Sequence, residues 1–222
     1  MPITAALDLI RTSNYKVMYK MKPTKLIFLP GAGGNRTFWM PVSNLLDHSS
    51  IREFIEWPGI GGVEEDPSIK SINDLADSVA IKIDQPTAII AQSMGGIVGL
   101  LSILKRPELV THLVLVVTSG GIPVDDIRSE DWRPAYIEAN PSYPDWFTNY
   151  TGDLTDKLMG INIPVLLIWG DADPISPVSI GEKLNGIFPN SQLEVITGGD
   201  HGLANTLSKN VAPLIQKHLI KA

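Results

Sequence analysis

The feature that most constrains the fold is an alternation of short apolar runs with longer helix-like stretches. The runs are 25–30 (KLIFLP), 86–91 (PTAIIA), 112–118 (HLVLVVT), 163–170 (IPVLLIWG) and a weaker one at 192–197 (QLEVIT). Runs of this kind are typical of strands that are covered on both faces. The helices expected between and after them lie at about 37–47, 72–83, 94–106, 179–188 and 203–220. Strand and helix in alternation predict an α/β fold with a mostly parallel sheet and right-handed crossovers.

Two parts of the chain depart from this alternation. Residues 7–11 and 15–20 flank a Thr-Ser-Asn turn, a pattern that predicts an antiparallel hairpin at the sheet edge. Residues 121–160 show no clean period and contain six of the 15 aromatic residues, with eight acidic against three basic side chains. Loops longer than about 15 residues rarely lack a role, so we expect a lid there. The alternative is a surface excursion whose aromatic residues only anchor it. The predicted division is a core formed by 1–120 and 161–222, with the lid inserted at 121–160.

Composition excludes several classes of protein. The length of 222 residues fits one domain with an insertion. The absence of cysteine excludes a disulfide scaffold, thiolate catalysis and cysteine-ligated metal sites. A net charge of -6 argues against nucleic acid and anionic membranes as partners. No apolar run reaches the roughly 18 residues of a membrane span, and Asp8 interrupts the first apolar stretch, which lacks a basic start. We therefore expect a cytoplasmic protein without a secretory signal.

The strongest motif follows the second apolar run and opens an apolar helix. It reads Ala91-Gln92-Ser93-Met94-Gly95-Gly96. A serine at the tip of a sharp strand-to-helix turn projects its hydroxyl above the sheet, and Gly95 and Gly96 leave the room that such a turn needs. The helix N-terminus beside Ser93 favours an anion that forms there. The alternative is a glycine-rich helix start with an idle serine.

A glycine-rich loop follows the first apolar run. It reads Leu29-Pro30-Gly31-Ala32-Gly33-Gly34. Glycines at this place let backbone N–H groups turn towards a bound oxyanion. A dinucleotide-binding loop would instead need glycine or alanine three places after Gly33, where Arg36 stands, so the nucleotide interpretation is weak.

Acidic residues and a histidine follow the last two apolar runs. The two loops read Trp169-Gly170-Asp171-Ala172-Asp173-Pro174-Ile175-Ser176-Pro177 and Gly198-Gly199-Asp200-His201-Gly202. Of the four histidines, only His201 lies in a glycine-flanked loop at the end of a strand, where open α/β sheets place their ligands. Alone, such a histidine is usually solvated. Together, the four loops supply oxyanion donors, nucleophile, acid and base, with the last three in the chain order Ser, Asp, His.

On these four motifs the chain resembles the α/β-hydrolase superfamily over essentially its whole length. Its small form is similar to the lipase/esterase-like and carbon–carbon hydrolase branches, which carry a helical lid after the sixth strand. The resemblance implies an eight-stranded, mostly parallel sheet with helices on both faces and a lid at 121–160. It also implies Ser93 as the nucleophile and His201 as the base, with no cofactor and no metal.

The family pattern also indicates the acid and the oxyanion hole. The register of Gly170, Asp173, Ile175 and Pro177 matches the family's run around the acid. The acid therefore falls on Asp173, with Asp171 as the alternative. The oxyanion donors would be the backbone N–H groups of Ala32 and Met94. Pro30 stands where the family commonly has histidine, which removes a supporting side chain but leaves the main-chain donors.

Loop residues near these motifs are expected to rim a substrate pocket, the alternative for each being packing in the core or the lid. They are Gly33, Phe38, Trp39, Ser119, Ile122, Trp146 and Leu203. The resemblance implies a serine hydrolase that acts through an acyl-enzyme. An aromatic lid over the serine favours a small or medium apolar acyl or alkyl group, so we expect a carboxylic ester as substrate. The acidity of 121–160 argues against a highly anionic thioester. Lyase, carbon–carbon hydrolase and perhydrolase chemistry on the same triad stay open, as does a non-catalytic small-molecule receptor. The sequence indicates no oligomeric state.

Overall fold

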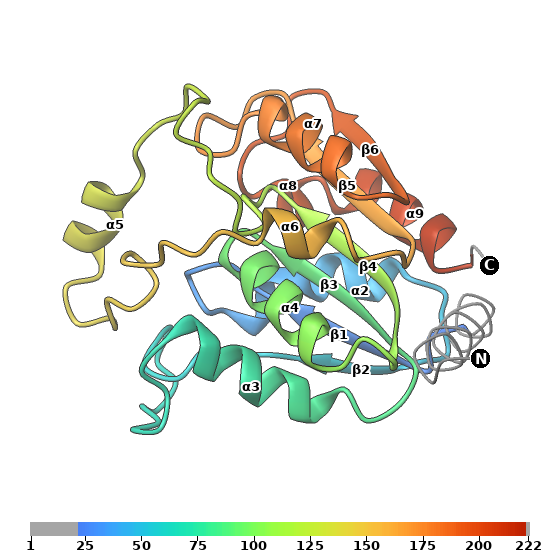
Figure 1. Cartoon of the computed structure of the whole chain (residues 1–222), viewed down its shortest axis with the longest axis horizontal. Helices are drawn as coiled ribbons and strands as arrows, with labels where there is room; N and C mark the ends of the chain where they lie inside the picture. The colour runs from blue at the N-terminus through green and yellow to red at the C-terminus, as the bar shows by residue number, and fades with distance from the viewer. Residues whose placement is uncertain (1–21, 221–222) are drawn as a thin grey trace, which may run out of the picture.

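One parallel sheet organises the protein in the computed structural model, which describes residues 22–220 (Figure 1). Its strands are β1 (Lys25–Leu29), β2 (Ile51–Phe54), β3 (Thr87–Gln92), β4 (Val110–Val116), β5 (Val165–Gly170) and β6 (Ser191–Ile196). They lie in the order β2-β1-β3-β4-β5-β6, and every neighbouring pair runs parallel. The predicted α/β fold with a mostly parallel sheet is confirmed.

The position of each strand in the sheet explains how clearly the sequence predicts it. Every residue of β1, β3, β4 and β5 is buried, because helices cover both faces of these inner strands. The edge strands β2 and β6 consist mainly of exposed and half-buried residues instead, with Ile196 buried at the end of β6. With only four residues and the sequence IREF, β2 forms no apolar run. An edge strand of this kind meets solvent and therefore needs no continuous apolar sequence.

The expected number of strands is corrected by the structure. Residues 22–220 form six strands rather than eight. The hairpin predicted at 7–11 and 15–20 lies outside the described residues. The apolar runs predicted as strands did not include β2, because a short, half-exposed strand of mixed polarity carries little periodic signal.

Helices cover both faces of the sheet (Figure 1). They are η1 (Arg36–Trp39), α2 (Met40–Leu45), α3 (Ile72–Lys82), α4 (Met94–Lys105), α5 (Arg133–Ala139), α6 (Thr155–Leu158), α7 (Val178–Ile187), α8 (Leu203–Thr206) and α9 (Ser208–Leu219). One face carries α3, α4 and α7, and the other carries α2 and α9. The helix expected over 203–220 is two helices, because the chain leaves helical geometry at Leu207. Within residues 22–220, no helix combines the length and the apolar character that crossing a bilayer would require.

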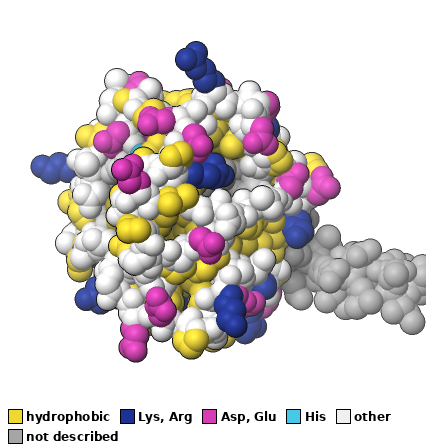
Figure 2. Space-filling model, turned by 90° about the vertical axis from the view of Figure 1, so that its left-hand side faces the viewer, with side chains coloured by type: hydrophobic (Ala, Val, Ile, Leu, Met, Phe, Trp, Pro, Cys, Tyr) yellow, Lys and Arg dark blue, Asp and Glu magenta, His cyan; other side chains and the backbone are white. Residues whose placement is uncertain are grey.

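Residues 121–160 leave the sheet as an extended excursion that carries α5 and α6 (Figure 1). Three rings form a small cluster within it, with Trp132 stacked on Phe147 at a centroid distance of 4.9 Å and Tyr136 set edge-on to both. Lys183 of α7 ties the start of the excursion to the core by an ion pair of 2.7 Å with Asp126. Figure 2 shows this side of the molecule, where hydrophobic side chains reach the surface and acidic side chains are scattered among them.

Candidate active site

Ser93 occupies a strained turn between β3 and α4. Its φ is 51° and its ψ is -123°, a backbone conformation that residues other than glycine rarely adopt. Two donors hold its carbonyl: the Thr118 hydroxyl at 2.6 Å and the Gly96 N–H at 2.9 Å. Its own N–H donates to the carbonyl of Val116 at 3.0 Å. The end of β4 therefore holds the turn at the end of β3, as a nucleophile elbow requires.

Glycine at position 95 permits this turn to pack closely. A Cβ there would press on the carbonyl oxygen of Pro30 and lie 2.7 Å from that of Leu29. The start of α4 thus rests directly on the end of β1. This contact brings Met94, the first residue of α4, next to the loop that contains Ala32. Both predicted oxyanion donors therefore lie at neighbouring strand ends.

His201 and Asp173 lie in line with Ser93. His201 Nε2 is 3.0 Å from Ser93 Oγ, and His201 Nδ1 is 2.8 Å from Asp173 Oδ2. Because an ionised carboxylate can only accept, the proton on Nδ1 is assigned to this bond, which leaves Nε2 to accept from the serine hydroxyl. The structure thus brings the three predicted residues together in the geometry of a nucleophile, a base and an orienting acid.

The Asp173 carboxylate is held rigidly from its other side. Its side chain has no exposed surface, whereas that of His201 is 27% exposed. Asp173 Oδ1 accepts from the N–H groups of Ile175 at 2.9 Å and of Ser176 at 3.1 Å. A buried carboxylate with these three partners has one available orientation, which directs Oδ2 at the imidazole.

Asp171, the alternative acid, lies elsewhere in the same loop. It is exposed, and its Oδ1 accepts from the N–H of Gly198 at 2.6 Å. Its backbone N–H donates to Ile196, and the N–H of Ala172 donates to Gly199. Asp171 therefore fastens the histidine loop to the acid loop and does not contact the imidazole.

The residues expected to rim a pocket fall into two groups. Trp39, Ile122 and Leu203 are buried in the core, whereas Gly33, Phe38, Ser119 and Trp146 are half-buried or exposed. The indole N–H of Trp39 donates to the carbonyl of Leu29 at 2.9 Å, so this side chain supports the end of β1. The carbonyl of Phe38 accepts from the side chain of Asn205, beyond His201 in sequence.

Several residues contact the site although the sequence predicted no role for them. Gln92 donates its side-chain amide to the carbonyl of His201 at 3.1 Å, and Thr118 supports Ser93 as described above. Trp57 and Tyr136 bind the carbonyls of Gly31 and Ala32. The nearest sequence signal was the position of Gln92 directly before the serine. The other three contacts join segments that no local pattern connects.

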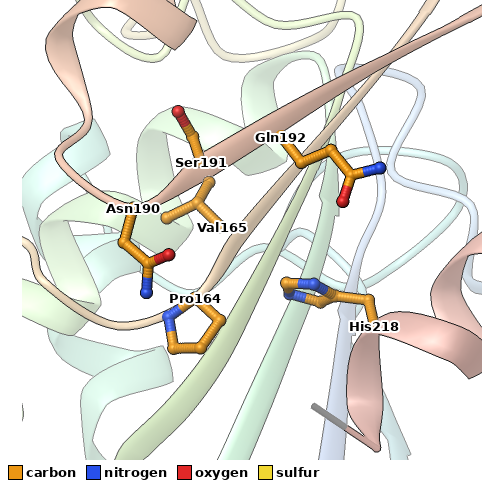
Figure 3. A pocket seen from close by; sticks show the side chains of 6 residues that line it. All are labelled: Pro164, Val165, Asn190, Ser191, Gln192 and His218. Carbon is orange, nitrogen blue, oxygen red and sulfur yellow. The ribbon is translucent and has the colours of Figure 1, made fainter. Parts of the chain in front are cut away.

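A pocket of about 150 Å³ lies at the other end of the strands (Figure 3). Its lining residues are Pro164, Val165, Asn190, Ser191, Gln192 and His218. They come from the amino ends of β5 and β6 and from α9, whereas Ser93 follows the carboxyl end of β3. This pocket is therefore separate from the candidate active site. Within the described residues, no three histidine or acidic side chains are grouped so that they could hold a metal ion.

Comparison with known proteins places the fold in a family. The family model described as the alpha/beta hydrolase family matches residues 26–148, more than half of the chain. The chain belongs to the alpha/beta hydrolase family. An esterase from Exiguobacterium antarcticum has the same fold, with a TM-score of 0.74 and 17% identity over 90% of this chain and 93% of that one.

Relatives in this family carry names of different activities. A pimeloyl-[acyl-carrier protein] methyl ester esterase of Neisseria meningitidis is 23% identical over 224 aligned positions, which cover 80% of this chain and 85% of that protein. A Synechocystis protein named for non-heme chloroperoxidase activity is 42% identical over 77 residues. That match covers 34% of this chain and only 26% of that protein. These relatives support a hydrolase of this family.

Proposed function

We propose that the protein is a serine hydrolase that cleaves small or medium apolar carboxylic esters through an acyl-enzyme. The observation that carries the proposal is the pair of hydrogen bonds that joins Ser93 Oγ to His201 and His201 to Asp173. A receptor that only binds a small molecule needs a pocket, but it needs neither a general base nor a buried carboxylate behind that base.

The proposed reaction proceeds in two halves. In the first, His201 Nε2 takes the hydroxyl proton as Ser93 Oγ attacks the ester carbonyl carbon, and Asp173 stabilises the imidazolium. The N–H groups of Ala32 and Met94 stabilise the tetrahedral oxyanion. Collapse of this intermediate expels the alcohol, which leaves with the proton from His201. Water then attacks the acyl-enzyme with His201 again as base, and the acid is released as Ser93 is restored.

We further propose that residues 121–160 act as a lid over this site. The segment contacts two site loops: Tyr136 donates its hydroxyl to the Ala32 carbonyl at 3.1 Å, and Glu130 donates its N–H to the Pro174 carbonyl at 2.8 Å. The aromatic cluster around Tyr136 favours an apolar acyl or alkyl group beside the loop. The eight acidic side chains of the segment disfavour a strongly anionic substrate.

Hydrolysis of a series of p-nitrophenyl esters of increasing acyl length tests this proposal. The parent protein should turn over the short and medium esters. Ser93→Ala should lose turnover by a factor on the order of 10⁶ while keeping the parent's circular dichroism spectrum. Parent-level turnover by Ser93→Ala would refute the proposed nucleophile.

A second candidate is perhydrolase chemistry, favoured by the 42% identity to the Synechocystis protein named for non-heme chloroperoxidase activity. Hydrogen peroxide in place of water would attack the acyl-enzyme, and a peracid would leave as Ser93 is restored. Peracid release from a short ester and peroxide, faster than carboxylic acid release from the same ester, would favour this candidate over the esterase.

A further inference from the structure

Two consecutive carbonyls of the oxyanion loop accept hydrogen bonds from aromatic side chains. The indole N–H of Trp57 donates to the carbonyl of Gly31 at 2.9 Å. The hydroxyl of Tyr136 donates to the carbonyl of Ala32 at 3.1 Å. Trp57 follows β2, and Tyr136 lies in α5 of the excursion. Two segments distant in sequence therefore each bind one of two consecutive peptide units.

These contacts determine where two backbone N–H groups point. In a planar trans peptide the C=O and the following N–H point in opposite directions, and no peptide bond in the described part of the chain is cis. When Trp57 holds the Gly31 carbonyl, the N–H of Ala32 must point away from the indole. In the same way, Tyr136 directs the N–H of Gly33. A peptide beside glycine would otherwise rotate easily, because glycine has no Cβ to restrict it.

The held loop lies directly against the nucleophile. A Cβ built on Gly31 would be 3.2 Å from Cβ of Ser93. Neither Ala32 nor Met94 is the donor of any backbone or side-chain hydrogen bond found among the described residues. The orientation that Trp57 imposes on the N–H of Ala32 therefore bears on a donor that stands next to Ser93.

The two side chains that bind the loop, Trp57 and Tyr136, differ in how firmly the fold holds them. Trp57 has no exposed surface and is packed in the core, so its bond is part of the folded protein. Tyr136 is half-buried and is held by Trp132 and Phe147, which lie in the excursion themselves. Burial, and then the nearby Tyr143, raise the pKa of Tyr136. A tyrosine hydroxyl is already protonated at neutral pH at its ordinary pKa of about 10, so this group is available as a donor.

We propose that Trp57 and Tyr136 are positioning residues of the oxyanion hole. Trp57 fixes the N–H of Ala32 in the folded core, and Tyr136 completes the alignment of the loop only when residues 121–160 rest against it. This inference rests on the proposed serine hydrolase function. It links the position of the lid to the stabilisation of the oxyanion, through one hydroxyl group.

Tyr136→Phe tests the bond between the lid and the oxyanion loop, here called the lid anchor, because it removes only the hydroxyl. Loss of a direct oxyanion donor costs about 10²–10³ in rate, and we expect a positioning bond to cost about tenfold in kcat, with KM changed less than about threefold. Affinity for a trifluoromethyl ketone, whose adduct with Ser93 places an oxyanion in the hole, should fall by the same factor as kcat/KM. A purely structural role would not link these two losses.

Tyr143→Phe is the matched control. The Tyr143 hydroxyl also joins the excursion to the core, but it accepts from the N–H of Gly61 at 3.1 Å and does not contact the oxyanion loop. This variant should keep the parent's kcat and ketone affinity. Equal losses in both variants, or a Tyr136→Phe protein with the parent's kcat, would overturn the lid anchor.

Trp57→Phe tests the bond between the Trp57 indole and the Gly31 carbonyl, with thermal unfolding measured in parallel. A folded variant should lose about 10-fold to 100-fold in kcat, together with the same factor in ketone affinity. A folded variant with the parent's kcat would overturn the role of Trp57. If this variant does not fold, the Tyr136→Phe and Tyr143→Phe pair decides the inference.

Failure of this inference is distinguishable from failure of the proposed function. Labelling of Ser93 by a fluorophosphonate needs no knowledge of the natural substrate. A parent protein that is not labelled would refute the serine hydrolase and the inference with it. A labelled parent whose Tyr136→Phe variant is labelled at the same rate would refute the inference alone.

Discussion

Strain concentrates at the two residues that follow the ends of β3 and β4. Ser93 and Val117 are the residues other than glycine with positive φ in the described part of the chain, at 51° and 43°. Such conformations cost on the order of 1–3 kcal/mol each and persist only where their surroundings hold them. The Thr118 hydroxyl, next to Val117, donates to the carbonyl of Ser93 and links the two sites of strain. This strain is consistent with a serine that is held ready for reaction.

At the same scale, two asparagine substitutions separate the candidate acids. Asp173→Asn should lower kcat by about 10⁴-fold, because an amide favours the wrong imidazole tautomer. Asp171→Asn should stay near the parent's kcat, because an amide oxygen can still accept from the N–H of Gly198. Steady-state kinetics on one p-nitrophenyl ester measures both. A larger loss in Asp171→Asn than in Asp173→Asn would assign the acid to Asp171.

At the scale of elements, two glycines in helices are expected to respond in opposite ways to alanine. Gly95→Ala would push a methyl group against the end of β1 and should destabilise the fold by about 1–3 kcal/mol. Gly186→Ala in α7 meets no atom within 4 Å and should stabilise it by up to about 1 kcal/mol. Urea denaturation of both variants gives the free energies of unfolding. A Gly95→Ala protein as stable as the parent would contradict the close contact of α4 with β1.

Elements with strong periodic signals were predicted, and those with weak signals were missed. For the inner strands and the long helices α3 and α4, most of the observed ends fall within one residue of the expected end. These elements were predictable because full burial demands an apolar sequence. The strand β2 was missed since an edge strand of four residues needs no such run. The break at Leu207 was missed because no proline or glycine marks it in the sequence.

At the scale of the whole molecule, acid should destabilise the fold. Hydrogen bonds from neighbouring hydroxyl, backbone N–H or lysine groups hold the pKa of five aspartates near the surface below the usual value: Asp66, Asp74, Asp84, Asp126 and Asp153. The stabilisation that these carboxylates provide is present above the unfolded pKa of about 3.9, and it is lost as the pH falls through their lower folded pKa values. The urea midpoint should therefore decrease as the pH drops below about 4.

One aspartate variant serves as a control for this pH dependence. Asp74 accepts from the Ser71 hydroxyl and from the N–H of Lys70, at the start of α3. Asp74→Asn should therefore show a smaller decrease of the urea midpoint in acid than the parent. A parent midpoint that is constant or rises as the pH falls below about 4 would contradict the prediction.

Contacts between distant segments mark the limit of what the sequence predicts. Ser93, Asp173 and His201 could be predicted to lie close together because each stands in a local motif after a strand, and parallel strands bring their carboxyl ends to one edge. The bonds of Trp57 to Gly31, Tyr136 to Ala32 and Gln92 to His201 join residues 26, 104 and 109 positions apart. No periodicity in the sequence indicates such pairs, so only the folded structure identifies them.

Intact mass after incubation with a fluorophosphonate, followed by peptide mapping, shows whether Ser93 is an activated nucleophile when Ser93→Ala is treated beside the parent. We expect one adduct per chain on the parent, located at Ser93, and none on the variant. A well-folded parent that gains no adduct, or an adduct that persists in Ser93→Ala, would contradict the claim that Ser93 is an activated nucleophile.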